Sequence, residues 1–204
     1  ITAKGILSNL KTDSVNLSLY DCVTSTNTLL KQMALDGKPE GEVIIALSQT
    51  AGRGRYNRKF YSDKGGIYMS ILLRPNDIID PALLTAATAV AVSDAIEKVS
   101  GKSTQIKWVN DVLIDSKKVC GILVESTTNP KTGLLDYAVI GIGVNVYEPE
   151  SGFDAEIKDI AASVFGKSND NGDVTRLAAE ILNQLSDVLA EPHSKEVLNE
   201  YRNR

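Results

Sequence analysis

A short cationic loop is the part of the sequence whose residue types are best suited to chemistry. Four cations fall between residues 53 and 59, namely Arg53, Arg55, Arg58 and Lys59, and a glycine precedes each of the first two. Arginine side chains and backbone N–H groups bind phosphate or carboxylate oxygens, and glycine lets the backbone approach a ligand or adopt a positive φ. The loop therefore predicts an anion site, with a solvated basic loop and an RNA-binding Arg-Gly segment as alternatives.

Three more stretches carry residues of catalytic type, each with a plainer interpretation. Residues 107–112 (KWVNDV) suit a tight Asn-Asp turn between strands. In 117–125 (KKVCGILVE), Lys118 opens an apolar strand, either as an edge lysine or with its ammonium at the mouth of a core pocket. Residues 141–146 (GIGVNV) are a weak dinucleotide fingerprint, because the third glycine is missing and no helix clearly starts there.

Composition limits the class of protein. The 204 residues, 43% hydrophobic and 24% charged, predict one globular domain. A net charge of −4 argues against binding of duplex nucleic acid by this chain. Cys22, Cys120 and the single His193 are too far apart to predict a metal cluster, and both cysteines are expected to be buried. With neither a membrane-spanning apolar run nor a signal peptide, we expect a cytoplasmic protein.

The pattern along the chain predicts an α+β fold with a mostly antiparallel sheet and helices packed on one side, because the predicted strands meet at short turns. Ser25 is expected to cap a helix that ends near Leu35, and Asp80-Pro81 to start a long helix over 82–99. The other expected elements are a short helix or linker at 1–12, strands at 42–48, 67–74, 104–108, 112–114, 118–126 and 137–146, and helices at 160–165, 174–190 and 194–203.

Taken together, the motifs resemble the catalytic core of biotin protein ligases in order and spacing, from about residue 20 to residue 147. The family's motifs GRGR-x-x-R-x-aromatic, KWPND, K-x-x-GILVE, Ser-Thr-Asn and GIG-x-N are matched by Gly52–Arg55 with Arg58 and Phe60, by Lys107, Trp108, Asn110 and Asp111, by Lys118 with Gly121–Glu125, by Ser25–Asn27, and by Gly141–Asn145. One departure is Val109, where the family usually has proline.

The resemblance implies an enzyme that activates biotin with ATP as biotinyl-5′-AMP and transfers it to a lysine of a biotin carboxyl carrier protein. Mg²⁺ would act through the ATP phosphates, without a side-chain cluster to hold it. Lys118, Arg53 and Asp111 would be catalytic. The implied biotin-binding residues are Ser25, Thr26, Gln49, Gly52, Arg53, Lys118 and Gly121. The implied ATP- and adenylate-binding residues are Arg53, Arg55, Phe60, Lys107, Trp108, Asn110 and Asn145, although a core position for Trp108 is equally compatible with the sequence.

The resemblance also sets expectations about organisation and partners. Residues 1–15 would be a linker or N-terminal extension and 16–204 the catalytic domain, without the family's small C-terminal β domain. The partner would be a carboxylase carrier domain. A homodimer is left open, and DNA binding would require an N-terminal winged helix outside these residues. A lipoate or octanoate ligase or transferase of the same fold, and the biotinyl-adenylate sensor of a repressor, remain alternatives.

Overall fold

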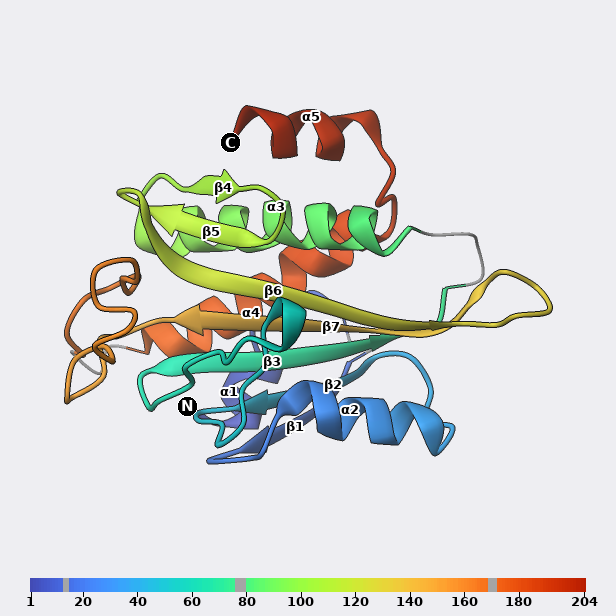
Figure 1. The fold of residues 1–204 in the computed structure, drawn as a ribbon, viewed down its shortest axis with the longest axis horizontal. Coiled ribbons are helices and arrows are strands. Elements are labelled where there is room, and N and C mark those ends of the chain that lie inside the picture. Colours follow the sequence, from blue (N-terminus) through green and yellow to red (C-terminus); the bar gives the residue numbers. More distant parts are fainter. Residues whose placement is uncertain (13–14, 76–79, 169–171) are drawn as a thin grey trace.

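A computed structural model describes residues 1–12, 15–75, 80–168 and 172–204 (Figure 1). The described residues form a seven-stranded sheet with the order β1-β2-β3-β7-β6-β5-β4. Its strands are β1 (Asn16–Tyr20), β2 (Glu42–Ala46), β3 (Gly66–Leu73), β4 (Gln105–Lys107), β5 (Asp111–Ile114), β6 (Lys117–Thr128) and β7 (Leu135–Asn145). The helices are α1 (Ala3–Leu7), α2 (Thr26–Leu35), α3 (Pro81–Ser100), α4 (Asp173–Leu189) and α5 (Lys195–Asn203), with a 3-10 turn, η1 (Arg55–Asn57), in the cationic loop.

The sheet is mixed, but nearly all of its strand pairs are antiparallel. Only β1 and β2 are paired in parallel among the described strands, and helix α2 connects them. A parallel pair needs such a crossover, whereas antiparallel neighbours can be joined by short turns. The predicted α+β class and mostly antiparallel sheet are confirmed. Strand β1 was not predicted, although Leu17 and Leu19 alternate with polar residues there.

Helices cover both faces of the sheet, so the expectation of helices on one side is wrong for α2 (Figure 1). Helices α1, α3 and α4 pack with Ile67 and Met69 of β3 in the main core. Leu30 of α2 packs with Leu72, which points to the opposite face of the same strand. Almost every residue of β3 is buried, which requires cover on both faces.

The predicted helix starts are confirmed. The Ser25 side chain accepts a hydrogen bond from the Thr28 N–H and caps α2, while Asp80 caps α3 with Pro81 in its first turn. No described helix is long and apolar enough to cross a bilayer. Of the two cysteines, Cys120 is buried as expected, whereas Cys22 is exposed.

The predicted helix at 160–165 is absent because its backbone groups bond elsewhere. The Lys118 N–H donates to the Ile160 carbonyl, 2.8 Å, and the Val164 N–H donates to the Asn145 carbonyl, 2.9 Å. These bonds attach the segment to β6 and β7 and hold it beside the cleft described below.

The N-terminal segment is docked against the domain. Ile6 of α1 is fully buried, and the Lys11 N–H donates to Asn183 Oδ1 of α4 over 2.8 Å. Residues 13 and 14 of the expected extension lie outside the described residues.

Candidate functional site

A cleft of about 480 Å³ lies at one face of the sheet. Most of the residues predicted for the site line it, and they come from α2, the cationic loop, the β4–β5 turn, β6 and β7. These are Ser25, Thr26, Gln49, Arg53, Arg55, Phe60, Lys107, Asn110, Asp111, Lys118, Gly121 and Asn145. Gly52 and Trp108 do not line it.

A network of uncharged polar groups forms part of the wall of the cleft. Gln49 Oε1 accepts from the Thr26 N–H, 2.8 Å, and Gln49 Nε2 donates to Ser62 Oγ, 2.9 Å. The buried Ser70 Oγ lies 2.8 Å from Thr26 Oγ1 and 2.6 Å from Asn27 Oδ1. Because these groups satisfy one another at the wall of the cleft, their positions are set without a ligand.

The floor consists of glycines at which a side chain has no room. A Cβ at Gly141 would lie 2.1 Å from Asn27 Oδ1, and one at Gly143 would lie 2.4 Å from the Phe60 ring. A Cβ at Gly121 would lie 2.7 Å from the same ring and 3.0 Å from Lys118 Nζ. Glycine is needed here for close approach, which brings Phe60 against the strand backbones.

The charged centre is an ion pair between neighbouring strands. Lys118 Nζ of β6 lies 2.7 Å from Asp111 Oδ1 of β5, and 5.4 Å from the centre of the Phe60 ring. Both charged side chains are partly exposed, at 31% and 24%, so a ligand can reach them. The structure thus brings two of the three predicted catalytic residues into direct contact.

Asparagines hold the backbone around this ion pair. Asn110 Nδ2 donates to the Ile122 carbonyl, 2.8 Å, and Ile122 returns a backbone bond to the Asn110 carbonyl, 2.9 Å. Asn145 Nδ2 donates to the Ala162 carbonyl, 3.1 Å. In this structure both amide groups fix the strands and the segment at the cleft, and their predicted contacts with nucleotide stay predictions.

The cationic loop lines the cleft, and backbone hydrogen bonds hold its shape, among them the bond from the Gly54 N–H to the Arg58 carbonyl, 2.8 Å. Arg53 contacts Glu125, with 3.4 Å between the guanidinium and the carboxylate, whereas the Arg55 guanidinium lies against the neighbouring Tyr56, which is itself 82% exposed. The positive φ angles expected at the loop glycines occur instead at Tyr56 and Asn57.

Gly52 is buried and has a packing role at the start of the loop. A Cβ there would lie 2.3 Å from Ser62 Oγ and 2.4 Å from the Phe60 carbonyl, so glycine is required for close contact rather than for a positive φ.

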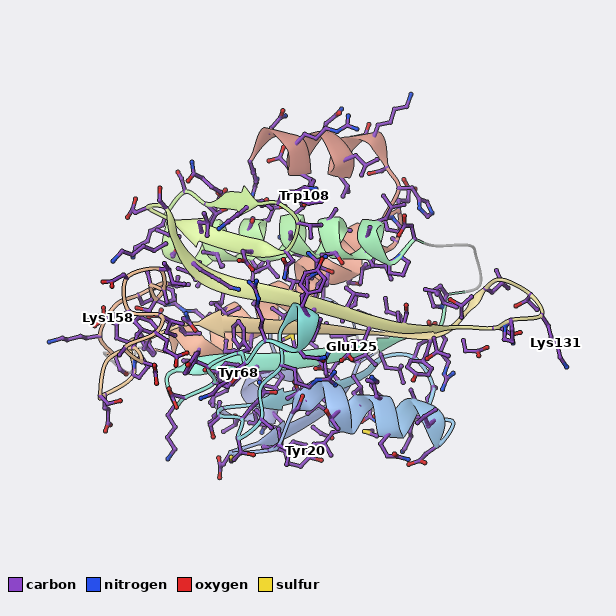
Figure 2. All side chains as sticks on the ribbon, viewed as in Figure 1. Tyr20, Tyr68, Trp108, Glu125, Lys131 and Lys158 are labelled. Carbon is purple, nitrogen blue, oxygen red and sulfur yellow. The ribbon has the colours of Figure 1, made fainter. Side chains whose placement is uncertain are left out.

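Trp108 is 81% exposed at the β4–β5 turn, so the alternative core position is wrong (Figure 2). The peptide bond between Trp108 and Val109 is cis. On the other side of the turn, Tyr201 of α5 donates its hydroxyl to the Val109 carbonyl, 2.9 Å. Trp108 therefore extends from a turn that a hydrogen bond from helix α5 holds in place.

Sequence reasoning assigned no role to three polar residues around the cleft. Asn27 and Ser70 belong to the polar network, and the Glu125 carboxylate forms an ion pair with the Arg53 guanidinium. Ser70 did carry a signal, as the one polar side chain within the apolar run of β3 other than the tyrosine hydroxyl. Glu125 carried a weaker one, as a charged residue that follows the apolar residues of β6.

The described residues contain no group of three or more His, Cys, Asp or Glu able to hold a metal ion. The carboxylates of Asp111 and Glu125 are each paired with cations.

The model of the biotin/lipoate A/B protein ligase family matches residues 19–145. The chain belongs to this family. Within the biotin/lipoate ligase family, a bifunctional ligase/repressor BirA of Bacillus spizizenii is 39% identical over 177 residues, which cover 85% of this chain and 54% of the relative. The biotin–[acetyl-CoA-carboxylase] ligase of Mycobacterium tuberculosis is 34% identical and is covered to 59%, against 79% of this chain. The chain thus spans little more than half the length of these relatives.

Solved structures of biotin/lipoate ligases share the fold. The biotin protein ligase of Aquifex aeolicus in complex with biotin and ATP is 29% identical, with a TM-score of 0.69 over 86% of this chain and 72% of that one. The Leishmania major enzyme in complex with biotinyl-5-AMP is 25% identical, with a TM-score of 0.72 over 92% and 80%.

Proposed function

We propose that this chain carries the ATP-dependent activation of biotin to biotinyl-5′-AMP and the transfer of the biotinyl group to a lysine of a carrier protein. The observation that carries the proposal is that two chemically different sets of groups line one cleft. One set is the cations Arg53, Arg55 and Lys118, and the other is a network of paired uncharged groups around Thr26 and Gln49. A ligand that is neutral at one end and anionic at the other fits this arrangement, and the names of the relatives support biotin as that ligand.

The cations address the main barrier of the first step. A carboxylate oxygen must approach an α-phosphate that is already negative, and two like charges about 4 Å apart repel by about 4 kcal/mol at an effective dielectric of 20. Lys118 and Arg53 lie at the wall of the cleft before the ligand arrives, so they offset this repulsion without reorganisation. The magnesium ion bound to the ATP phosphates lowers the negative charge further.

Asp111 has a role in the second step. The incoming lysine has an ordinary pKa near 10.4, so only about 0.1% of it is neutral at pH 7.4. Once the adenylate phosphate engages Lys118, the Asp111 carboxylate beside it is available to hold the incoming ammonium and to accept a proton as the C–N bond forms.

The polar network accounts for recognition of the uncharged ring of the acid. Its hydroxyl and amide groups, from Thr26 and Gln49, can bond a ureido ring, which donates and accepts hydrogen bonds. The dithiolane ring of lipoate offers no such N–H or C=O groups. This difference supports biotin over lipoate as the acid.

The proposed partner is a biotin carboxyl carrier domain, because the relatives include an acetyl-CoA-carboxylase ligase. We infer a cytoplasmic location, where ATP and carboxylases are available.

Mass spectrometry of the protein after incubation with biotin, ATP and Mg²⁺ tests the activation step. We expect a bound species with the mass of biotinyl-adenylate, and pyrophosphate release that depends on biotin but not on lipoate. Release driven by lipoate alone would identify a lipoate ligase, and no adenylate with either acid would refute the proposed activity.

A further inference from the structure

The carboxylate of Glu125 in β6 contacts several polar groups and is not among the residues that line the cleft. Its Oε1 lies 3.0 Å from Lys31 Nζ of α2 and 3.4 Å from the Arg53 guanidinium, and its Oε2 accepts from Asn27 Nδ2 over 3.0 Å. Its side chain is only 17% exposed, beside α2 (Figure 2). One carboxylate thus gathers groups from a helix, a loop and the polar network.

The environment keeps this carboxylate ionised. Burial alone would raise the pKa of Glu125, but the hydrogen bonds from Asn27 and Lys31, and the charges of Lys31 and Arg53, hold it below its usual value. The groups of Asn27, Lys31 and Arg53 that face Glu125 are all hydrogen-bond donors. An uncharged amide at position 125 would point its own N–H groups at one of these donors, and that contact would be lost.

The contact with Arg53 leaves most of that guanidinium available. Glu125 meets one terminal nitrogen, Arg53 is 39% exposed, and an arginine has five N–H donors arranged as a planar fork. Arg53 is one of the residues that line the cleft. Arg53 is thus attached to β6 on one edge and exposed to a ligand on the other, although the loop that carries it has few other side-chain contacts.

We propose that Glu125 is a positioning residue, which holds Arg53 ready for the carboxylate of the acid substrate by anchoring one edge of its guanidinium. This inference rests on the proposed function and adds a residue to it. Immobilising a long side chain costs free energy at the moment of binding, and an anchor that is already present reduces that cost. The contribution is therefore specific to ligands that bear the anion.

A purely structural interpretation is available, in which Glu125 only ties α2 to the sheet through Lys31 and Asn27. The two interpretations differ in which ligands should bind more weakly when the Glu125 carboxylate is removed. A loosened α2 would weaken the binding of any ligand that uses the polar network, charged or not. A released Arg53 would weaken only ligands with a carboxylate.

The test is calorimetric titration of Glu125→Gln with biotin and with biotinol, in which an uncharged alcohol replaces the carboxylate. We expect the affinity for biotin to fall about 3- to 10-fold and that for biotinol to change less than about twofold, the size of effect for one side chain that must be ordered on binding. The matched control is Lys31→Gln, which removes the other cation on the same oxygen and leaves Arg53 anchored, so both affinities should stay within about twofold.

Coupling to Arg53 gives a second readout. Arg53→Gln should itself weaken biotin, and Glu125→Gln added to it should cause no further loss, because the anchored group is gone. If Glu125→Gln does not fold, Glu125→Asp, which keeps the charge, carries the same comparison of biotin with biotinol.

Equal losses of biotin and biotinol, or a Lys31→Gln variant that behaves like Glu125→Gln, would overturn the positioning role. Additive losses in the double variant would do the same. Wild-type protein that binds neither compound would instead refute the proposed function, and the inference with it.

Discussion

In the polar network of the cleft, Thr26, Gln49 and Ser70 bond one another within the protein, whereas the cations of the loop are mostly exposed and have few side-chain partners among the described residues. The polar groups are buried or part-buried, and leaving them unpaired would cost about 1–3 kcal/mol each. The cations are near water and incur no such cost. The polar groups are therefore positioned before a ligand arrives, and so are Lys118 and Arg53 beside their carboxylate partners, whereas the exposed part of the loop depends on a ligand's anions for its final arrangement.

The largest effect is expected for a substitution of Lys118, the cation that strand β6 holds in place. Lys118 projects from a strand, so Lys118→Ala removes a preorganised cation, and adenylate formation should fall about 10²- to 10³-fold. Pyrophosphate release with biotin and ATP measures it, with Lys117→Ala, at the exposed neighbouring position, as the control. Wild-type rates in Lys118→Ala would show that Lys118 does not carry the activating charge.

A side chain added at Gly141, beside the polar network, should destabilise the protein. Gly141→Ala places a methyl group 2.1 Å from Asn27 Oδ1, so we expect the free energy of unfolding to fall by about 1–3 kcal/mol and biotin binding to weaken. Urea titration measures the stability. Gly54→Ala in the loop is the control, because its Cβ meets nothing closer than 3.4 Å and its φ is −116°, and stability should change by less than about 0.5 kcal/mol. Equal stabilities would contradict the tight packing at Gly141.

Asp111→Asn distinguishes the two chemical steps. It keeps the shape of the side chain but removes the charge that would hold the incoming ammonium, so single-turnover transfer from preformed adenylate should slow about 10-fold or more. Adenylate formation should slow less. If both steps slow equally, Asp111 acts only by holding Lys118.

The smallest effect is expected in the exposed part of the loop. The Arg55 side chain forms no ion pair with a carboxylate among the described residues and lies against the exposed Tyr56, so Arg55→Gly should leave adenylate formation within a few-fold of wild type while speeding escape of the intermediate several-fold. Adenylate dissociation rates measure this directly. A streptavidin blot of an added non-carrier protein should show biotin on bystander lysines, and an unchanged dissociation rate without such labelling would mean that the loop does not retain the intermediate.

Local signals predicted most of the fold. The caps at Ser25 and Asp80 and the apolar runs of β3, β6 and β7 marked elements that the structure confirms. Residues 160–165 were predicted wrongly because a helix-favouring composition yielded to hydrogen bonds with distant strands. The position of α2 on its own face depended on tertiary packing, which the short-turn argument for the sheet did not include.

Some residues of the candidate site could be predicted from the sequence and others could not, because contacts between distant segments decide part of the site. Residues with an unusual pattern, such as the cationic loop and the residues around Lys118, stood out along the chain. Glu125 and Asn27 did not, because their importance comes from meeting across 98 residues of sequence. A motif shows which residue types are present, whereas pairing across strands decides which of them touch.

The exposed position of Trp108 has a practical consequence. It is the only tryptophan of the sequence, it is 81% exposed, and its turn contributes Lys107 and Asn110 to the cleft. The intrinsic fluorescence of the protein above the tyrosine band therefore comes from one indole at the rim of the site. An event that covers Trp108 would move that indole from water into a less polar environment and shift its emission to shorter wavelength, so burial of this turn can be followed optically without a label.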